Sequence, residues 1–277
     1  MIQLQIFNNI SVESPVIAWW SGGADSAVTC WLCIMWFGAM NVRIVFIDNY
    51  NEDDDVYRFK QDCEKWYGVK IETISSKEYN DIEDVWTDNL SLNTATGAIC
   101  STIMKLKVRQ AFQMRNDFSY QAFGFDVDEL NRAIKMKQNY SECNPIFPLV
   151  YELYKKGDAM KVLKKFRIEP PLPYRLGYRN NNCFNTGCVQ GGIGYWQKLK
   201  NDFPEKVHRM AMLEHKLTDL KGEPVTCLKD QSKGGGLVFL EPHPNYPNMK
   251  DLSMMKGRAV EPLIECNGFC GAKINDS

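Results

Sequence analysis

The chain has 277 residues, of which 44% are hydrophobic and 12% aromatic, so it can bury a large core. Its formal net charge of −1 excludes a global basic field that would attract nucleic acid, and the basic run at 155–167 reads as a solvated helix face. The first residues lack the basic start and continuous apolar core of a signal peptide, and the longest apolar stretch, 27–40, is short for a bilayer span. We therefore expect a soluble, cytoplasmic protein without a membrane partner.

The first half of the chain alternates between short apolar segments and helical segments. Continuous apolar runs bounded by turn residues predict strands at 15–20, 42–48, 69–74 and 119–125. The segments between and after them predict helices at 25–40, 52–66, 101–115 and 128–137. Strand–helix alternation is typical of parallel strands with crossover helices. We expect an α/β fold with a doubly wound, mostly parallel sheet over residues 1–150.

From about residue 150 the pattern changes. Short helices are expected at 150–155 and 158–166, and a helix pair at 193–200 and 204–217. Between them the segment IEPPLPYRLGYRNNNCFNTGCVQGGIGYW is rich in Pro, Gly and Asn and is not a regular element, and the tail from Thr218 should be rich in loops. The prediction is thus two domains: 1–150, the α/β domain, and 151–277, a helical and loop-rich region that contains cysteine pairs.

The turn after the first strand carries the strongest functional signal. It reads SGGADS and places Ser21, Gly22, Gly23, Asp25 and Ser26 between a strand and a helix. Glycines let the backbone approach an anion closely, and the free N–H groups at a helix start bind phosphate. The Asp25 carboxylate would repel phosphate unless a cation lies between them, which suggests Mg²⁺. The alternative is that Asp25 and Ser26 only cap the helix.

This turn is neither a Walker A loop nor a Rossmann fingerprint. SGGADS resembles the SGGxDS signature of the PP-loop, or ATP-pyrophosphatase, superfamily, in which the loop holds the β,γ-pyrophosphate of ATP or the corresponding phosphate of a nucleotide substrate. The resemblance implies an adenine nucleotide as ligand and the adenine nucleotide alpha-hydrolase-like fold.

Three further segments resemble the phosphoadenosine phosphosulfate (PAPS) reductase-like branch of that superfamily. They are FIDNYNEDDDVYRF, CSTIMK and GFDVDELNR. The matching positions, which the resemblance makes nucleotide-binding or catalytic, are Asp48, Cys100, Lys105, Gly124, Glu129 and Arg132. For Lys105 a solvated surface lysine is the alternative to neutralising phosphate charge, and for Glu129 and Arg132 it is a simple i,i+3 ion pair.

Ten cysteines are present, which in a reducing compartment favours core residues, metal ligands or redox groups over a disulfide framework. Two short-spaced pairs with glycine between their members, Cys183 with Cys188 and Cys266 with Cys270, could together hold Zn²⁺ or an iron–sulfur cluster. The alternative is two unrelated loops with ordinary thiols. Cys30 and Cys33, on an apolar helix, are expected in the core.

The resemblance implies an enzyme that binds ATP (or PAPS) with Mg²⁺. The favoured activity is ATP-dependent adenylation coupled to sulfur transfer, with Asp25 and Lys105 as catalytic residues and a thiolate of Cys100 or Cys183 as sulfur carrier. The alternatives are a thiol-dependent reductase of PAPS or adenylyl sulfate and a non-catalytic nucleotide-binding subunit of a larger assembly. A sulfur-donor protein, a thioredoxin-like reductant, a nucleic-acid substrate and a second copy of the chain stay open as partners.

Overall fold

The computed structural model describes residues 12–94, 97–261 and 263. Its centre is a five-stranded sheet with the order β3-β2-β1-β6-β7, in which every neighbouring pair is parallel. The strands are β1 (Val16–Trp20), β2 (Val42–Asp48), β3 (Ile71–Ser75), β6 (Tyr120–Ala122) and β7 (Pro145–Ile146). The four predicted strands are confirmed, the last in shortened form, and β7 was not predicted.

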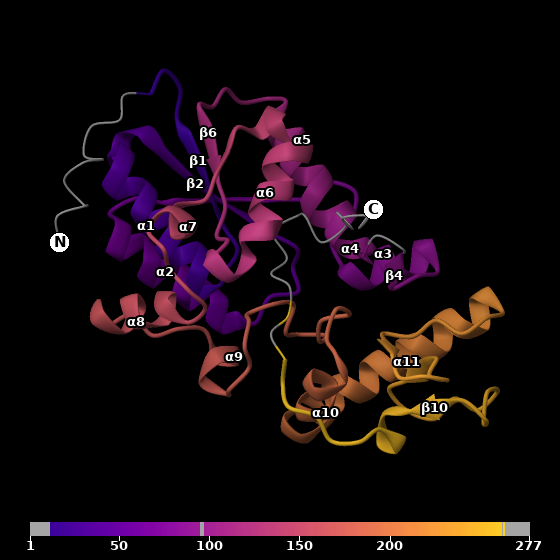
Figure 1. Cartoon of the computed structure of the whole chain (residues 1–277). Helices are drawn as coiled ribbons and strands as arrows, with labels where there is room; N and C mark the ends of the chain where they lie inside the picture. The colour runs from indigo at the N-terminus through magenta and orange to yellow at the C-terminus, as the bar shows by residue number, and fades with distance from the viewer. Residues whose placement is uncertain (1–11, 95–96, 262, 264–277) are drawn as a thin grey trace.

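Helices cover both faces of this sheet, as Figure 1 shows. Successive residues of a strand point to opposite faces, and in β1 both sets are buried. Val16, Ala18 and Trp20 pack in a core with α1, α2 and α8, whereas Ile17 and Trp19 pack in a second core with α5 and α6. These helices are α1 (Ala24–Phe37), α2 (Asp54–Tyr67), α5 (Lys107–Gln113), α6 (Leu130–Asn139) and α8 (Asp158–Lys165). The doubly wound α/β fold is therefore confirmed.

The helix expected at 101–115 is not a regular α-helix along its whole length. It starts as α4 (Ile99–Ser101), continues as a π-helical segment (Thr102–Leu106) and ends as α5. Such π-helical insertions are rare and occur frequently at functional sites. The segment contains Lys105, one of the predicted site residues.

A third core joins the C-terminal region to part of the first half of the chain. Trp196 in α10 (Ile193–Asp202) and Leu217 in α11 (Pro204–Lys221) share it with Trp86 in α3 (Ile82–Asn89). Packing thus crosses residue 150, and the predicted division into two domains stays a prediction. Further short elements include α7 (Pro148–Tyr151), α9 (Leu172–Arg175) and the antiparallel pair β4 (Asn93–Thr94) and β5 (Gly97–Ala98).

The tail after α11 holds more structure than the expected loops. It forms a three-stranded sheet of order β10-β9-β8, with β8 (Leu228–Lys229), β9 (Leu237–Phe239) and β10 (Lys250–Asp251). Glu214 of α11 is fully buried and ties this sheet to the helix, because its two carboxylate oxygens accept the backbone N–H groups of Cys227 (2.6 Å) and Leu240 (2.8 Å). None of the helices in the described part of the chain combines the length and the hydropathy that crossing a bilayer requires.

Candidate functional site

The SGGADS turn lies where β1 ends and α1 begins, at the carboxyl end of the sheet. Gly22 has a positive φ of 82°, which favours glycine. Gly23, the residue before α1, has no side chain to cap the helix. Ser26, which is 1% exposed, fixes the loop: its hydroxyl donates to the carbonyl of Gly23 (2.9 Å) and accepts from the backbone N–H of Ser21 (3.0 Å). The turn is therefore a rigid loop that leads into a helix N-terminus, the geometry that binds phosphate.

Two buried carboxylates lie at this loop, Asp25 within it and Asp126 beside it. Asp25 is 5% exposed and forms an ion pair with the Lys156 ammonium group at 3.1 Å. Asp126 is fully buried; one of its oxygens accepts the Glu129 N–H (3.1 Å), and the other, Oδ2, has no hydrogen-bond partner among the described residues. Burial, with the negative charges of Asp25 and Glu129 adding to it, raises the pKa of Asp126 to about 6. The Asp25 carboxylate in the loop thus has the Asp126 carboxylate as a neighbour.

Gly124 explains how β6 comes so close to the loop. A Cβ atom on Gly124 would lie 3.0 Å from the backbone N and Cα of Ser26, so only glycine allows this approach. The close packing brings Asp126, two residues further on, next to Asp25. Asp126 was not predicted as a site residue, although it stands inside the GFDVDELNR segment that was singled out.

Asp48 lies at the carboxyl end of β2, the strand next to β1. It is 6% exposed, and its two oxygens accept from the Tyr50 backbone N–H (2.8 Å) and from the Tyr57 hydroxyl (2.8 Å). Both oxygens therefore hold the loop after β2 in shape. A nucleotide contact of Asp48 stays a prediction.

Lys105 is buried, 6% exposed, so the alternative of a solvated surface lysine is wrong. Its ammonium group pairs with the carboxylate of Glu52, also buried, at 3.4 Å. The Glu52 carbonyl in turn accepts from the Asn185 side chain at 2.7 Å, so the ion pair lies against the cysteine-containing segment. Burial of an ion pair is costly unless each charge has a partner, and the Lys105–Glu52 contact meets that need.

Glu129 and Arg132 form the i,i+3 ion pair that was one of the two expectations. The Arg132 guanidinium also lies over the Phe125 ring at 4.5 Å. Glu129 lies close enough to Asp126 for its charge to raise that pKa, so the pair flanks the two carboxylates at the loop. A direct contact with nucleotide stays a prediction.

The asparagine-rich segment 180–186 connects these parts, and its role was missed. Asn181 donates to the Gly22 carbonyl (3.2 Å), and Asn51, in the loop after β2, donates to the Thr186 hydroxyl (2.7 Å). Asn49, in the same loop, donates to the Cys183 sulfur at 3.0 Å. The three consecutive asparagines before Cys183 were the available signal, because amides that both donate and accept suit such bridging.

Of the four cysteines predicted as metal ligands, the structure describes Cys183 and Cys188. Cys183, Cys188 and Cys100 are all buried, between 6% and 8% exposed, in the third core. Burial raises the pKa of Cys227 in that core, and nearby Glu214, Cys188 and Cys100 add to the effect. Cys266 and Cys270 lie outside the described residues, so the shared metal site stays a prediction. Within 12–94, 97–261 and 263 no group of three or more His, Cys, Asp or Glu residues could hold a metal ion. Cys30 and Cys33 are fully buried, as expected for the core.

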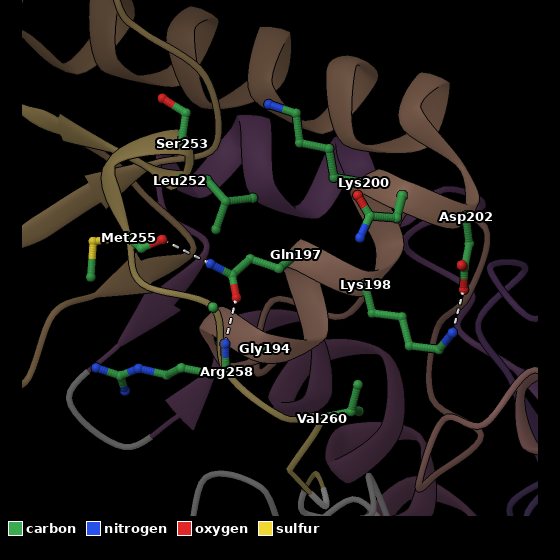
Figure 2. Close-up of a pocket in the computed structure, with 12 residues that line it drawn as sticks. Gly194, Gln197, Lys198, Lys200, Asp202, Leu252, Ser253, Met255, Arg258 and Val260 are labelled. Atoms are coloured by element: carbon green, nitrogen blue, oxygen red, sulfur yellow. Dashed lines mark hydrogen bonds and ion pairs between the residues drawn. The ribbon is translucent and has the colours of Figure 1, made fainter.

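A separate hollow of about 600 Å³ lies between α10 and residues 252–260 (Figure 2). Gln197 spans it and donates to the Met255 carbonyl, while Lys198 pairs with Asp202 at its edge. None of its lining residues belongs to the 21–26 loop or to the predicted site residues. This hollow is therefore separate from the candidate site at the 21–26 loop.

The solved structures to which the chain is similar include the following three, each with a low sequence identity. PAPS reductase from Candida auris, in a phosphate complex, is 13% identical, with 65% of this chain and 86% of that chain covered and a TM-score of 0.45. The U34-tRNA thiolase NcsA from Methanococcus maripaludis, with its [4Fe-4S] cluster, is 17% identical, with 84% and 82% covered and a TM-score of 0.43. The NH3-dependent NAD synthetase from Campylobacter jejuni, with nitrate, is 15% identical, with 80% and 92% covered and a TM-score of 0.41.

Among curated proteins, the chain is 24% identical over 213 residues to an uncharacterised protein of Methanocaldococcus jannaschii. That alignment covers 70% of this chain but only 40% of the relative, so the match spans two fifths of the relative's length. The family model of the phosphoadenosine phosphosulfate reductase domain matches residues 15–138, which contain the SGGADS loop, Asp48, Lys105 and the segment after β6. Over residues 15–138 the chain is therefore similar to the phosphoadenosine phosphosulfate reductase domain family, and the SGGADS loop lies inside the matched segment.

Proposed function

We propose that this protein is an enzyme that binds ATP at the 21–26 loop and uses it to adenylate a substrate. The observation that carries the proposal is the rigid glycine loop at the N-terminus of α1 with two buried carboxylates, Asp25 and Asp126, beside it. Backbone N–H groups there would bind the phosphates, and the Lys156 ammonium group adds positive charge.

The side chains at the loop fit Mg²⁺. Asp126 Oδ2 is a buried carboxylate oxygen without a hydrogen-bond partner in the described part of the chain, and Asp25 is its charged neighbour. Mg²⁺ prefers one or two carboxylates together with substrate phosphates and water. Bound there, it would neutralise the negative charge of the departing pyrophosphate.

We further propose that adenylation is coupled to sulfur transfer. In the first step a substrate oxygen attacks the α-phosphorus of ATP, the bond to the β-phosphate breaks and pyrophosphate leaves. In the second step the terminal sulfur of a cysteine persulfide, loaded by a sulfur-donor protein, attacks the activated carbon, and AMP leaves with the oxygen. An external dithiol then cleaves the remaining S–S bond, which releases the thiolated product and oxidises the dithiol to a disulfide. Cys183, beside Asn49 and close to the Glu52–Lys105 pair through the 185–186 segment, is the thiol we assign to sulfur delivery, with Cys100 as the second candidate.

A reductase of PAPS or adenylyl sulfate is the second candidate, because the matched family model is that of the PAPS reductase domain. In that reaction a thiolate attacks the sulfur of the sulfonucleotide, and the nucleotide leaves with its phosphate. A thioredoxin-like dithiol then releases sulfite and is itself oxidised to a disulfide. The same loop would bind the 5′-phosphate of the substrate.

The test is to incubate the purified protein with Mg²⁺ and either ATP or PAPS, and to measure nucleotide affinity, pyrophosphate release and sulfite release. With water in place of the substrate oxygen, we expect ATP binding and slow pyrophosphate release that Asp25→Asn abolishes, while the exposed carboxylate variant Asp219→Asn leaves both unchanged. Sulfite from PAPS without pyrophosphate from ATP would favour the reductase. Binding without turnover of either nucleotide would favour a non-catalytic subunit, and absence of binding to both would overturn the proposal.

A further inference from the structure

A short turn from the second half of the chain touches the start of α1, at the 21–26 loop. The Tyr174 hydroxyl, in α9, accepts a hydrogen bond at 3.2 Å from the backbone N–H of Ala24, the first residue of α1. The ring of Tyr174 is half-buried and packs against the core formed by β1, α1 and α2. The hydroxyl therefore stands at the end of the helix that would face a phosphate.

The α9 turn is held in this position by α2. Arg58 donates to the carbonyls of Glu169 and Pro170, at 3.2 Å each, and Arg175 pairs with Asp55 at 2.9 Å. Asp55 and Arg58 also pair with each other, so these three side chains and two carbonyls form one network. Prolines before and inside α9 restrict its backbone further. A turn fixed so firmly holds its tyrosine in one place.

We propose, on the basis of the proposed function, that Tyr174 is a phosphate-binding residue of the nucleotide site. A hydroxyl can accept and donate at once. Since Tyr174 accepts from the helix N–H, its own proton is polarised and becomes a better donor to an anionic oxygen. The Ala24 N–H group at the start of α1 thus donates to the Tyr174 hydroxyl. The hydroxyl in turn donates to an oxygen of the pyrophosphate part of ATP.

A second buried group at the same loop points to a ligand there. Asn181 is 6% exposed and donates to the Gly22 carbonyl, but its Oδ1 atom has no hydrogen-bond partner among the described residues. A buried acceptor without a donor is costly. A donor from the ligand, such as water bound to Mg²⁺, would satisfy it.

The experiment compares Tyr174→Phe with the wild type in calorimetric titrations with Mg²⁺ and three probes: ATP, pyrophosphate and adenosine. We expect about tenfold weaker binding of ATP and of pyrophosphate, because one hydrogen bond to a charged group is lost. Adenosine has no phosphate, so its affinity should not change. Tyr246→Phe is the matched control, since its hydroxyl contacts the Gly222 carbonyl in the C-terminal region, and it should leave all three affinities unchanged.

Unchanged ATP and pyrophosphate affinities in Tyr174→Phe would overturn the assignment, as would an equal loss for adenosine, which would indicate a structural role. If Tyr174→Phe does not fold, Arg175→Met replaces it: loosening of the α9 turn should weaken pyrophosphate binding, and unchanged binding would overturn the assignment. A wild-type chain that binds adenosine but neither ATP nor pyrophosphate would overturn the proposed function, and this assignment with it.

Discussion

Replacement of Gly124 by alanine should reveal how closely the segment after β6 and the 21–26 loop are packed. The added Cβ atom would lie 3.0 Å from the backbone N and Cα of Ser26 and 3.2 Å from the carbonyl carbon of Asp25. Ordinary contacts of this kind are several tenths of an ångström longer, and none of these backbone atoms can rotate away. Either β6 or the start of α1 must shift, and such overpacking costs about 1–3 kcal/mol of the free energy of unfolding.

Urea unfolding measures this cost, and ATP titration measures its effect on the loop. A shift of the start of α1 moves the N–H groups that we propose bind phosphate, so ATP affinity should fall together with stability. Gly236→Ala is the control, because no atom lies within 4 Å of its added Cβ, and its effect should stay within about 0.5 kcal/mol. If Gly124→Ala unfolds at the same urea concentration as the wild type and binds ATP equally well, the close-packing argument is refuted.

Three further predictions concern buried groups. Burial raises the pKa of Glu214 from its ordinary 4.5 to about 8, so the folded state keeps a proton that the unfolded state releases. Stability should therefore fall as pH rises from about 4.5 to about 8, by at most about 1.4 kcal/mol per pH unit, and urea unfolding of Glu214→Gln should lack this slope. Lys105→Met should destabilise the chain by about 3 kcal/mol, because it leaves the buried Glu52 carboxylate without this ion pair, and a double-mutant cycle with Glu52→Gln should recover part of the loss. Burial raises the pKa of Cys30 and Cys33. Iodoacetamide at pH 8 should therefore label neither thiol until the protein is denatured. Labelling of either thiol in the native protein, measured by mass spectrometry, would contradict their place in the core.

The parts of the site that lie on one stretch of chain could be predicted from the sequence. A continuous apolar run before Ser21 and an apolar helix after Ser26 are local patterns, and they imply the strand–loop–helix geometry by themselves. Alternation of such segments implies a parallel sheet, because crossover connections follow strict rules of handedness and order. The glycine-rich turn between β1 and α1, and the fold around it, could therefore be predicted without coordinates.

The shape of the C-terminal region was harder to predict. The short strands β8, β9 and β10 are two or three residues long, too short for a periodic pattern to distinguish them from loops. They are stabilised by Glu214, which stands on a helix that ends before the first of them. A buried glutamate on a helix cannot be told from an exposed one by its neighbours in sequence.

Only the tertiary structure decided which distant groups meet at the loop. Asp126 lies about a hundred residues after Asp25, Tyr174 meets Ala24 across 150 residues, and Lys105 is buried because Glu52 is there to pair with it. Local patterns encode which element a segment forms and which face it buries. They carry no information about which polar side chains the crossovers bring together. That pairing determines whether two aspartates become neighbours and whether a lysine is buried.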